Sequence, residues 1–304
     1  MEKHRPNRAA AYGLVRKETH RLTDEFGVPG SFYLMKQMQT TKGENVTHLL
    51  KDKTAIVYGA GGGLGSAVAR TFARERAAVV LAGRTRASLE AVADSIEGIA
   101  EVAVVDALDE KEVEAHVERV VANHGTLDIS FNLISRGDVQ NIPLLQMKAS
   151  DMLRASLDGL KSNFLTARAA GNQMVRQGSG VILHLNSGSG AGAQPGMGST
   201  GPADAATESF MRYLAAEIGP AGVRVCGIWT AGVADTLTEE RLRAVGGEAT
   251  PDPAKVVEMI SSMSALRRAP VSSEVAETAA FLASDRASGI TGDMSNVTSG
   301  LVLR

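Results

Sequence analysis

The sequence predicts a doubly wound α/β fold, in which a parallel sheet is covered by helices on both faces. The first observation is that short β-branched runs alternate with longer amphipathic stretches from Thr54 onward. The second is that these runs are mostly apolar, as expected for strands buried on both faces of a parallel sheet. The third is a glycine-rich turn that joins the first run directly to the first amphipathic stretch.

The alternating elements can be followed in order along the chain. Residues 51–304 contain no internal repeat, low-complexity tract or linker, so we expect them to form a single domain. The strands are predicted at Thr54–Tyr58, Ala78–Ala82, Glu101–Val105, Asp128–Leu133, Val181–Leu185 and Val223–Ile228. The helices between them are predicted at Leu64–Glu75, Ala87–Ile96, Glu110–His124, Met147–Gln177 and Thr207–Ile218.

The composition excludes several classes of protein. Of 304 residues, 44% are hydrophobic and 22% are charged, a balance that excludes a disordered chain. The single cysteine, Cys226, excludes a disulfide framework and a thiolate zinc site and favours a reducing compartment, the cytoplasm. A net charge of -2 gives no reason to expect a nucleic-acid partner, and no apolar run approaches the roughly 20 residues of a membrane helix. No cluster of His, Asp or Glu has metal-ligand spacing, so we expect no metal.

Residues 1–50 differ from the rest and are interpreted as an N-terminal extension. They hold eight Lys or Arg residues against five Asp or Glu residues, and residues 7–26 have a loosely amphipathic helical pattern. Their acidic residues argue against a transit peptide. Two interpretations stay open: an arm that covers a neighbouring subunit, or a start codon assigned too early, since Met35 and Met38 lie just before the folded pattern begins.

The glycine-rich turn runs from Gly59 to Gly65, between the first predicted strand and the first predicted helix. Glycines allow the backbone to turn tightly and to approach a pyrophosphate, whose charge is attracted by the N–H groups and dipole at the start of a helix. No Gly-Lys-Ser/Thr follows, which argues against a nucleoside triphosphate loop. We therefore predict a dinucleotide site that includes Gly59, Gly63, Leu64 and Gly65.

The end of the second predicted strand indicates which dinucleotide is bound. An NAD site usually has an acidic residue there, which accepts a hydrogen bond from the ribose 2′-hydroxyl. This chain has Arg84 instead. A guanidinium at this position would bind a 2′-phosphate through charge-assisted hydrogen bonds, so NADP(H) is predicted over NAD(H). The alternative is that Arg84 is a solvated surface residue.

The glycine turn occurs together with Asp106, which ends the third predicted strand, and Asn132 in the fourth. Three further segments complete the pattern: Gly180-Val-Ile-Leu-His-Leu-Asn-Ser187, Leu214–Val225 and Ser273–Gly292. In this combination the chain resembles the short-chain dehydrogenase/reductase family over about residues 51–304. The resemblance implies a Rossmann-type sheet of about seven strands and an oxidoreductase acting on a small molecule. It also implies a homotetramer or dimer, held together by the two long helices.

The resemblance also implies roles for individual residues. Asp106 would contact the adenine, Asn132 would hold the fourth strand against the cofactor, and Gly232 with Thr236 would border the nicotinamide. Taken alone, Asp106 is equally compatible with a helix cap, and Asn132 with a buried amide whose hydrogen bonds are satisfied.

The catalytic positions depart from the family pattern. Members of the family use a serine, a tyrosine, a lysine four residues after it, and an asparagine; the lysine lowers the pKa of the tyrosine. Ser187 matches the serine, but Thr200 and Asp204 stand where the tyrosine and the lysine belong. Gly159 stands at the asparagine position. The candidate catalytic residues are therefore Ser187, Thr200 and Asp204.

Other residues that carry acid–base chemistry are interpreted as structural. Tyr213 lies nine residues after Asp204 on the same predicted helix, which places it on the opposite face. His184 is expected to be a hydrogen-bonded core residue, and His116, in a charged helix, is expected to be solvated.

Two functions follow from these observations. The first is an NADP-dependent oxidoreductase that acts on a carbonyl or alcohol, in which Ser187 polarises the oxygen and the proton comes from water, the substrate or Asp204. The alternative is a catalytically silent NADP(H)-binding protein that acts as a sensor or a partner subunit. Family membership favours the enzyme, and the absence of the tyrosine and lysine favours the silent protein.

Overall fold

Seven parallel strands form a sheet in the order β3-β2-β1-β4-β5-β6-β7. The computed structural model describes residues 48–247 and 251–303, and the chain from His48 onward forms one compact unit. Residues 1–47, including the helical pattern over 7–26, lie outside the described residues. The doubly wound α/β class is confirmed. The strand order reverses between β1 and β4, and in such sheets ligands bind at the carboxyl ends of the strands next to this reversal.

The strands agree with the sequence pattern where the residues are buried. β1 matches its prediction at both ends, whereas β5 and β6 each continue toward the carboxyl edge, so that Ser187 is the last residue of β5. The strands are β1 (Thr54–Tyr58), β2 (Ala78–Gly83), β3 (Ala100–Val104), β4 (Ile129–Asn132), β5 (Gly180–Ser187), β6 (Val223–Thr230) and β7 (Met294–Val297).

The helices follow the predicted stretches, with three more after β6. The helix that carries Asp204 begins at Thr200, so the predicted stretch from Thr207 covers only its later part. Within the described residues, no helix is long and apolar enough to cross a membrane. The helices are α3 (Gly63–Arg74), α4 (Arg86–Ala93), α5 (Glu110–His124), α6 (Ala149–Gln177), α7 (Thr200–Ile218), α8 (Glu239–Gly246), α9 (Pro253–Met263) and α10 (Ser272–Ala283).

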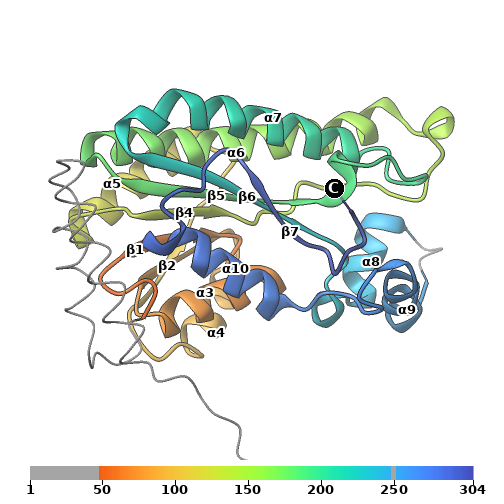
Figure 1. The fold of residues 1–304 in the computed structure, drawn as a ribbon, viewed down its shortest axis with the longest axis horizontal. Coiled ribbons are helices and arrows are strands. Elements are labelled where there is room, and N and C mark those ends of the chain that lie inside the picture. The colour runs from red at the N-terminus through yellow and green to blue at the C-terminus, as the bar shows by residue number, and fades with distance from the viewer. Residues whose placement is uncertain (1–47, 248–250, 304) are drawn as a thin grey trace, which may run out of the picture. The chain divides into compact units, whose positions relative to one another are not determined.

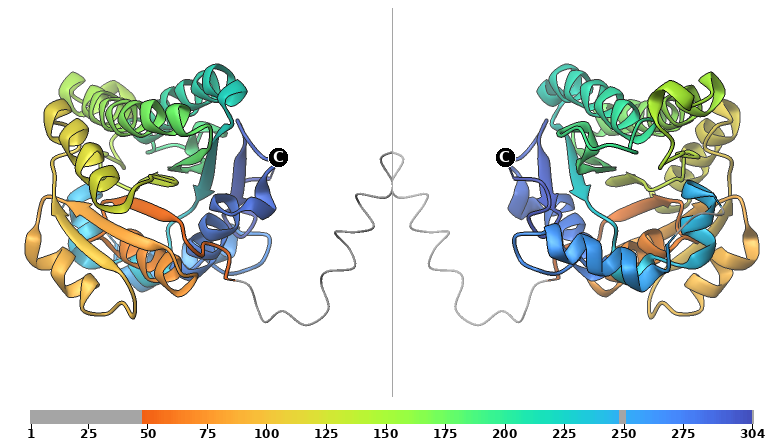
Figure 2. Two further views of the ribbon diagram at one scale, coloured as in Figure 1. Left: turned by 90° about the vertical axis from the view of Figure 1, so that its left-hand side faces the viewer. Right: turned by 90° about the vertical axis from the view of Figure 1, so that its right-hand side faces the viewer.

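The helices form a layer on each face of the sheet (Figures 1 and 2). Helices α3, α4 and α10 pack on one face, and α5, α6 and α7 pack on the other. Helices α8 and α9 follow β6 and lie together at one end of the molecule (Figure 1). This end holds the segments that follow the carboxyl ends of the strands.

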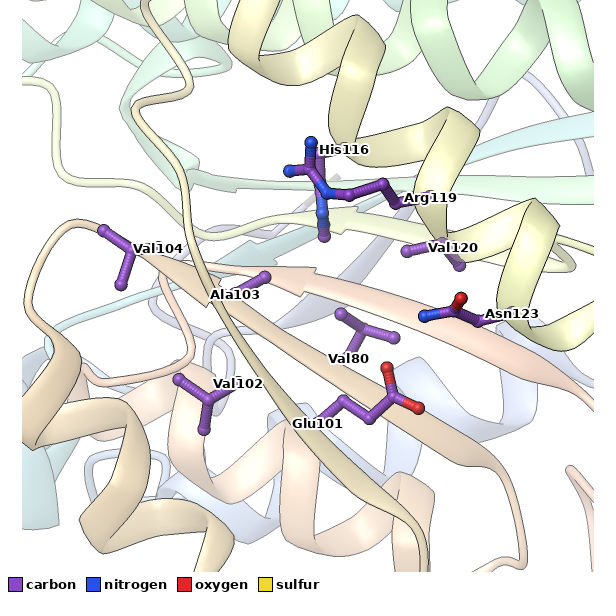
Figure 3. Close-up of a pocket in the computed structure, with 9 residues that line it drawn as sticks. All are labelled: Val80, Glu101, Val102, Ala103, Val104, His116, Arg119, Val120 and Asn123. Carbon is purple, nitrogen blue, oxygen red and sulfur yellow. The ribbon is translucent and has the colours of Figure 1, made fainter.

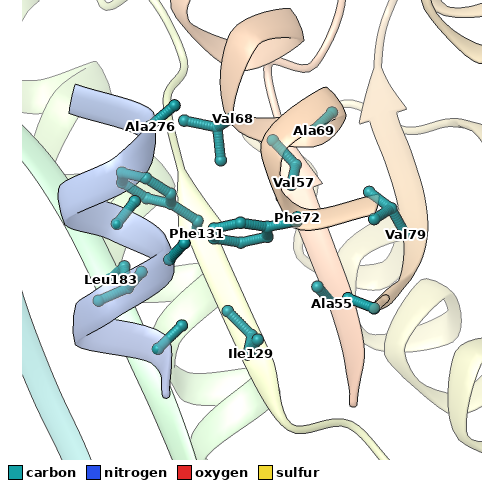
Figure 4. Close-up of a cluster of buried hydrophobic side chains, with 14 of the residues drawn as sticks. Ala55, Val57, Val68, Ala69, Phe72, Val79, Ile129, Phe131, Leu183 and Ala276 are labelled. Carbon is teal, nitrogen blue, oxygen red and sulfur yellow. The ribbon is translucent and has the colours of Figure 1, made fainter. Parts of the chain in front are cut away.

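The hydrophobic core beneath α3 and α10 packs against β1 and β4, the two strands that lead into the candidate site. Phe72 of α3 packs toward Phe131 of β4, and both are fully buried among aliphatic side chains (Figure 4). Burying a phenylalanine contributes on the order of 1.5–3 kcal/mol. The strands that carry the glycine turn and Asn132 are therefore anchored directly behind the candidate site.

Candidate active site

The glycine turn between β1 and α3 leaves no room for side chains. Gly59 has a φ of +81°, and a Cβ on it would lie 2.7 Å from the carbonyl oxygen of Leu133. A Cβ on Gly65 would lie 2.1 Å from the carbonyl oxygen of Gly59. The first turn of α3 has no acidic residue, and its N-cap residue, Gly62, supplies no side-chain hydrogen bond. The N–H groups at the start of α3 are thus available to an anion, as a bound dinucleotide requires.

Arg84 lies next to this turn in the chain segment that follows β2. It comes directly after Gly83, the last residue of β2, and its side chain is exposed. A Cβ on Gly61 would lie 2.4 Å from the Ser88 hydroxyl oxygen, so the start of α4 is packed against the glycine turn. The exposed guanidinium therefore belongs to the segment that borders the turn.

The side chains of Asp106 and Asn132 hold the backbone at the ends of β3 and β4. One Asp106 carboxylate oxygen accepts a hydrogen bond from the Leu108 N–H at 3.0 Å, in the turn that precedes α5. The Asn132 side chain accepts from the Ile134 N–H at 3.0 Å and donates to the Thr166 hydroxyl at 3.2 Å. Asn132 is buried, and its hydrogen bonds shape the start of the loop after β4.

The segment after β6 lies over the glycine turn. A Cβ on Gly63 would be 3.0 Å from Cγ2 of Thr236, whose hydroxyl donates to the Val233 carbonyl. A Cβ on Gly232 would be 2.5 Å from Cδ1 of Ile260, in α9. The structure thus brings Gly232 and Thr236 to the same end of the sheet as Gly59, Gly63, Leu64 and Gly65.

Asp204 is the centre of a buried polar cluster. It lies in the second turn of α7 with an exposed fraction of 0%. Its Oδ2 accepts a hydrogen bond from the Ser187 hydroxyl at 2.5 Å, and its Oδ1 accepts from Arg136 Nη2 at 2.5 Å. The Asn186 side-chain amide donates a hydrogen bond to the backbone carbonyl of Asp204 at 3.1 Å. Of the three candidate catalytic residues, Ser187 and Asp204 are therefore in direct contact.

Arg136 is the member of this cluster that sequence reasoning missed. It lies in the loop after β4, and its Nε also contacts the Asp138 carboxylate at 3.1 Å. Its Cδ is 2.7 Å from where a Cβ on Gly159 would lie, so Gly159 leaves the space that the arginine side chain fills. The sequence held one indication that such a residue exists. A carboxylate expected inside a site, such as Asp204, requires a cation beside it, because an unpaired buried charge is strongly destabilising.

The pKa of Asp204 is set by its burial and by its hydrogen-bond partners. Burial raises its pKa to about 6 from an ordinary value of 3.8, although Arg136 and the Ser187 hydroxyl oppose the rise. For Arg136, burial alone would lower the pKa, but the two carboxylates outweigh it and the pKa is raised. Arg136 thus stays charged, and Asp204 can exchange its proton close to neutral pH.

Thr200, the third candidate catalytic residue, makes its hydrogen bond elsewhere. It is buried at the start of α7, and its hydroxyl oxygen accepts a hydrogen bond from Gln140 Nε2 at 3.1 Å. Nearby, the Ser199 hydroxyl accepts from the Val139 N–H at 2.8 Å. Both bonds attach the loop after β4 to the start of α7. They fix the loop that carries Arg136.

Comparison with known proteins places the chain in a family. The profile of the family described as "Enoyl-(Acyl carrier protein) reductase" matches residues 59–302. The chain belongs to the short-chain dehydrogenase/reductase family. It is 30% identical to the 3-oxoacyl-[acyl-carrier-protein] reductase FabG of Staphylococcus aureus, over 83% of this chain and 98% of that protein. The short-chain dehydrogenases/reductases are oxidoreductases with a nucleotide cofactor, and the glycine turn fits that cofactor.

Two solved structures of short-chain dehydrogenases/reductases show the same fold. Levodione reductase superposes with a TM-score of 0.76 at 25% identity, covering 83% of this chain and 98% of its own. The 7α-hydroxysteroid dehydrogenase complexed with NADH and 7-oxo glycochenodeoxycholic acid has a TM-score of 0.73 at 26% identity, covering 85% and 98%. The seven-stranded sheet is thus that of the family.

One hollow of this short-chain dehydrogenase/reductase lies away from the cluster of Asp204. It has a volume of about 270 Å³ and lies between β3 and α5, where His116, Arg119 and Glu101 are among the lining residues (Figure 3). The expectation that His116 is solvated is wrong: it is buried edge-on against Tyr58, at 5.8 Å between ring centres. Burial lowers its pKa to about 4, so it is neutral. The hollow contains none of the candidate catalytic residues.

Proposed function

We propose that this protein is an NADP(H)-dependent oxidoreductase that interconverts a carbonyl and an alcohol, with its proton carried by Ser187 and Asp204. The observation that carries the proposal is the 2.5 Å hydrogen bond from the Ser187 hydroxyl to a fully buried carboxyl whose pKa is about 6. A general acid is most effective when its pKa lies near the working pH. Asp204 meets this condition.

The proposal assigns Thr200, Asp204 and Gly159 to the tyrosine, lysine and asparagine positions of the family. The changes compensate one another, which supports this assignment. Asp204 replaces a cation by an anion, and Arg136 enters from the loop after β4 to restore a positive charge. Gly159 provides the space for the stem of that arginine. The site thus keeps a cation and a titrating acid: the acid stays on α7, and the cation comes from the loop after β4.

In the direction of reduction, the two side chains act in sequence. The Ser187 hydroxyl donates its proton to the substrate oxygen, and protonated Asp204 donates its proton to the Ser187 oxygen. A reduced nicotinamide dinucleotide, held by the glycine turn and the start of α3, would supply the hydride for this reduction. The carboxylate that remains on Asp204 is stabilised by Arg136, and it takes up a proton from solvent before the next turnover. In the direction of oxidation, the carboxylate accepts the proton by the same route.

The choice of NADP(H) over NAD(H) is supported by Arg84. Its guanidinium is exposed beside the glycine turn, where it is available to a 2′-phosphate. The glycine turn and the start of α3 would hold the diphosphate, and Thr236 lies beside them.

Self-association is supported by the exposed surface of α6. Leu157 is 64% exposed, and the apolar side chains near it repeat at intervals of three and four residues, which places them on one helix face. Exposed apolar faces of this kind mark protein interfaces, and most soluble oligomers are symmetric. We propose that a second copy of the chain covers this face together with Tyr213 of α7, in a dimer or tetramer. The apolar residues of the face are Leu153, Leu157, Leu160 and Phe164.

A specific observation favours the second candidate, a silent NADP(H)-binding protein. Both carboxylate oxygens of Asp204 are already hydrogen-bonded and the residue is fully buried, as expected for a purely structural charge pair. In that case the chain would bind NADPH and act as a sensor or as a partner subunit.

The test is NADPH oxidation with a panel of ketones and 3-oxoacyl thioesters, with the affinity for NADPH measured in parallel. We expect turnover that falls by about 100-fold or more in Asp204→Asn, because positioned proton transfer is worth 10²–10⁴-fold. NADPH affinity should stay within about twofold. Glu208→Gln is the control, since Glu208 is a second buried acid on α7 that bonds Trp229 instead. NADPH binding without turnover of any substrate would establish the silent protein.

A further inference from the structure

Arg241, near the start of α8, lies against the glycine turn although it is far from it in the sequence. A Cβ on Gly63 would be 2.8 Å from Arg241 Nη1, and a Cβ on Gly62 would be 3.6 Å from Nη2. The same Nη1 donates a hydrogen bond to the Thr236 carbonyl at 3.1 Å. The guanidinium is thus held at the start of α3 by a segment that follows β6.

The charge of this guanidinium has no carboxylate partner in the part of the chain that the structure describes. No acid of residues 48–247 or 251–303 forms an ion pair with Arg241. By contrast, Arg243 on the same helix pairs with Glu239 at 2.6 Å. The first turn of α3 also lacks an acid. The positive end of the α3 dipole and the Arg241 charge therefore lie side by side, and both favour an anion at this place.

We propose that Arg241 binds the diphosphate of the nicotinamide dinucleotide, opposite the N–H groups of the glycine turn. The inference rests on the proposed function, since it assumes that the turn holds a dinucleotide. A guanidinium has five N–H donors and is well suited to phosphate oxygens, and a single bond to the Thr236 carbonyl leaves most of them available. The diphosphate would then be held from both sides, by backbone N–H groups of α3 and by a side chain of α8.

The far end of α8 contacts the loop that carries Arg136. The Gln140 N–H donates to the Val245 carbonyl at 2.9 Å, and the Gln140 side chain bonds Thr200. A diphosphate bound by Arg241 would therefore fix a helix that also touches the wall of the proton-transfer site. Arg241 would act as a binding and positioning residue, separate from Ser187 and Asp204.

The test compares Arg241→Ala with Arg243→Ala, using calorimetry with NADPH, NADH and ADP-ribose. ADP-ribose carries the diphosphate but no nicotinamide, so it separates a diphosphate contact from an effect through Thr236. We expect Arg241→Ala to weaken all three ligands by about tenfold, as for the loss of a charged hydrogen bond at an exposed site. Arg243→Ala should leave all three within about twofold. Both residues are exposed, and unchanged circular dichroism will show that each variant folds.

The results separate this inference from the proposed function. Weaker binding of NADPH and NADH with unchanged ADP-ribose would overturn the inference, because the arginine would then act through the nicotinamide end. Unchanged or tighter binding of all three ligands by Arg241→Ala would also overturn it, and would leave the dinucleotide site in place. A parent protein that binds neither NADPH nor NADH would overturn the inference and the proposed function together.

Discussion

Removing the cation beside Asp204 should make the stability of the protein depend on pH in a new range. In the parent protein the pKa of Asp204 is about 6 when folded, against an ordinary value of 3.8. The folded state therefore holds this proton more tightly than the unfolded state, and stability falls as pH rises from about 4 to 6 and is level above that. Arg136 lowers this pKa, so Arg136→Gln should move it further upward.

The magnitude of the effect follows from the size of one pKa unit. Each unit is worth about 1.4 kcal/mol of free energy of unfolding while the folded state alone keeps the proton. If the pKa in Arg136→Gln rises to about 8, as for deeply buried carboxyls, the variant should lose about 2 kcal/mol more than the parent between pH 6 and pH 8. Below pH 6 the carboxyl is protonated in both proteins. The penalty of the substitution should therefore be smallest there.

Urea unfolding of the parent and of Arg136→Gln at pH 5.5, 6, 7 and 8 measures this difference directly. The double variant Arg136→Gln/Asp204→Asn is the control. It removes the titrating group, so the additional loss between pH 6 and pH 8 should disappear. A difference between parent and Arg136→Gln that is the same at pH 6 and pH 8 would refute the electrostatic coupling of the two side chains.

Three further outcomes are expected. The kcat/KM for carbonyl reduction should fall about tenfold per pH unit above about 6, because Asp204 must be protonated in this direction. The kcat/KM for alcohol oxidation should rise about tenfold per pH unit up to about 6 and level off above it, because Asp204 must be ionised; flat profiles in both directions would contradict this. NADPH should raise the Tm more than NADH at equal concentration, and Arg84→Ala should remove most of that preference; equal stabilisation of the parent by both would argue against NADP(H). Light scattering should show a dimer or tetramer that Leu157→Glu dissociates, since the charge would enter the exposed face of α6; a monomeric parent would disprove the assembly.

The strands were predictable where burial leaves a clear pattern. β1 is fully buried, and its apolar run marked both ends. β7 has the sequence Met-Ser-Asn-Val and lies at the edge of the sheet, where partial exposure removes the apolar signal, so no run in the pattern pointed to it. The helical pattern marked only the part of α7 from Thr207, because Gly201 and Pro202 interrupt it before that point, although proline is compatible with the first turn of a helix.

The candidate site was predictable only where a residue follows directly from a strand or a helix. Ser187 ends β5 and Asp204 lies on α7, so their elements set their positions. Arg136 lies in a loop, and nothing local in the sequence fixes the direction of its side chain. The burial of His116 had a signal that its charged neighbours hid: it falls on the helix face of Val113, Val117 and Val120, at helical spacing.

The space beside Gly159 has a consequence for how this site can change by mutation. A Cβ at that position would meet the Arg136 side chain, and a lysine introduced by Asp204→Lys would place two cations together and leave the arginine without its main partner. A single step back toward the family pattern, at Gly159 or at Asp204, therefore carries a penalty while Arg136 remains. Even Thr200→Tyr combined with Asp204→Lys leaves Arg136 in place, so its gain in activity should depend on a further change at Arg136. On the proposed assignment, Arg136, Gly159 and Asp204 can be exchanged only as a set, so intermediates between this site and the usual catalytic arrangement should be less stable than either end.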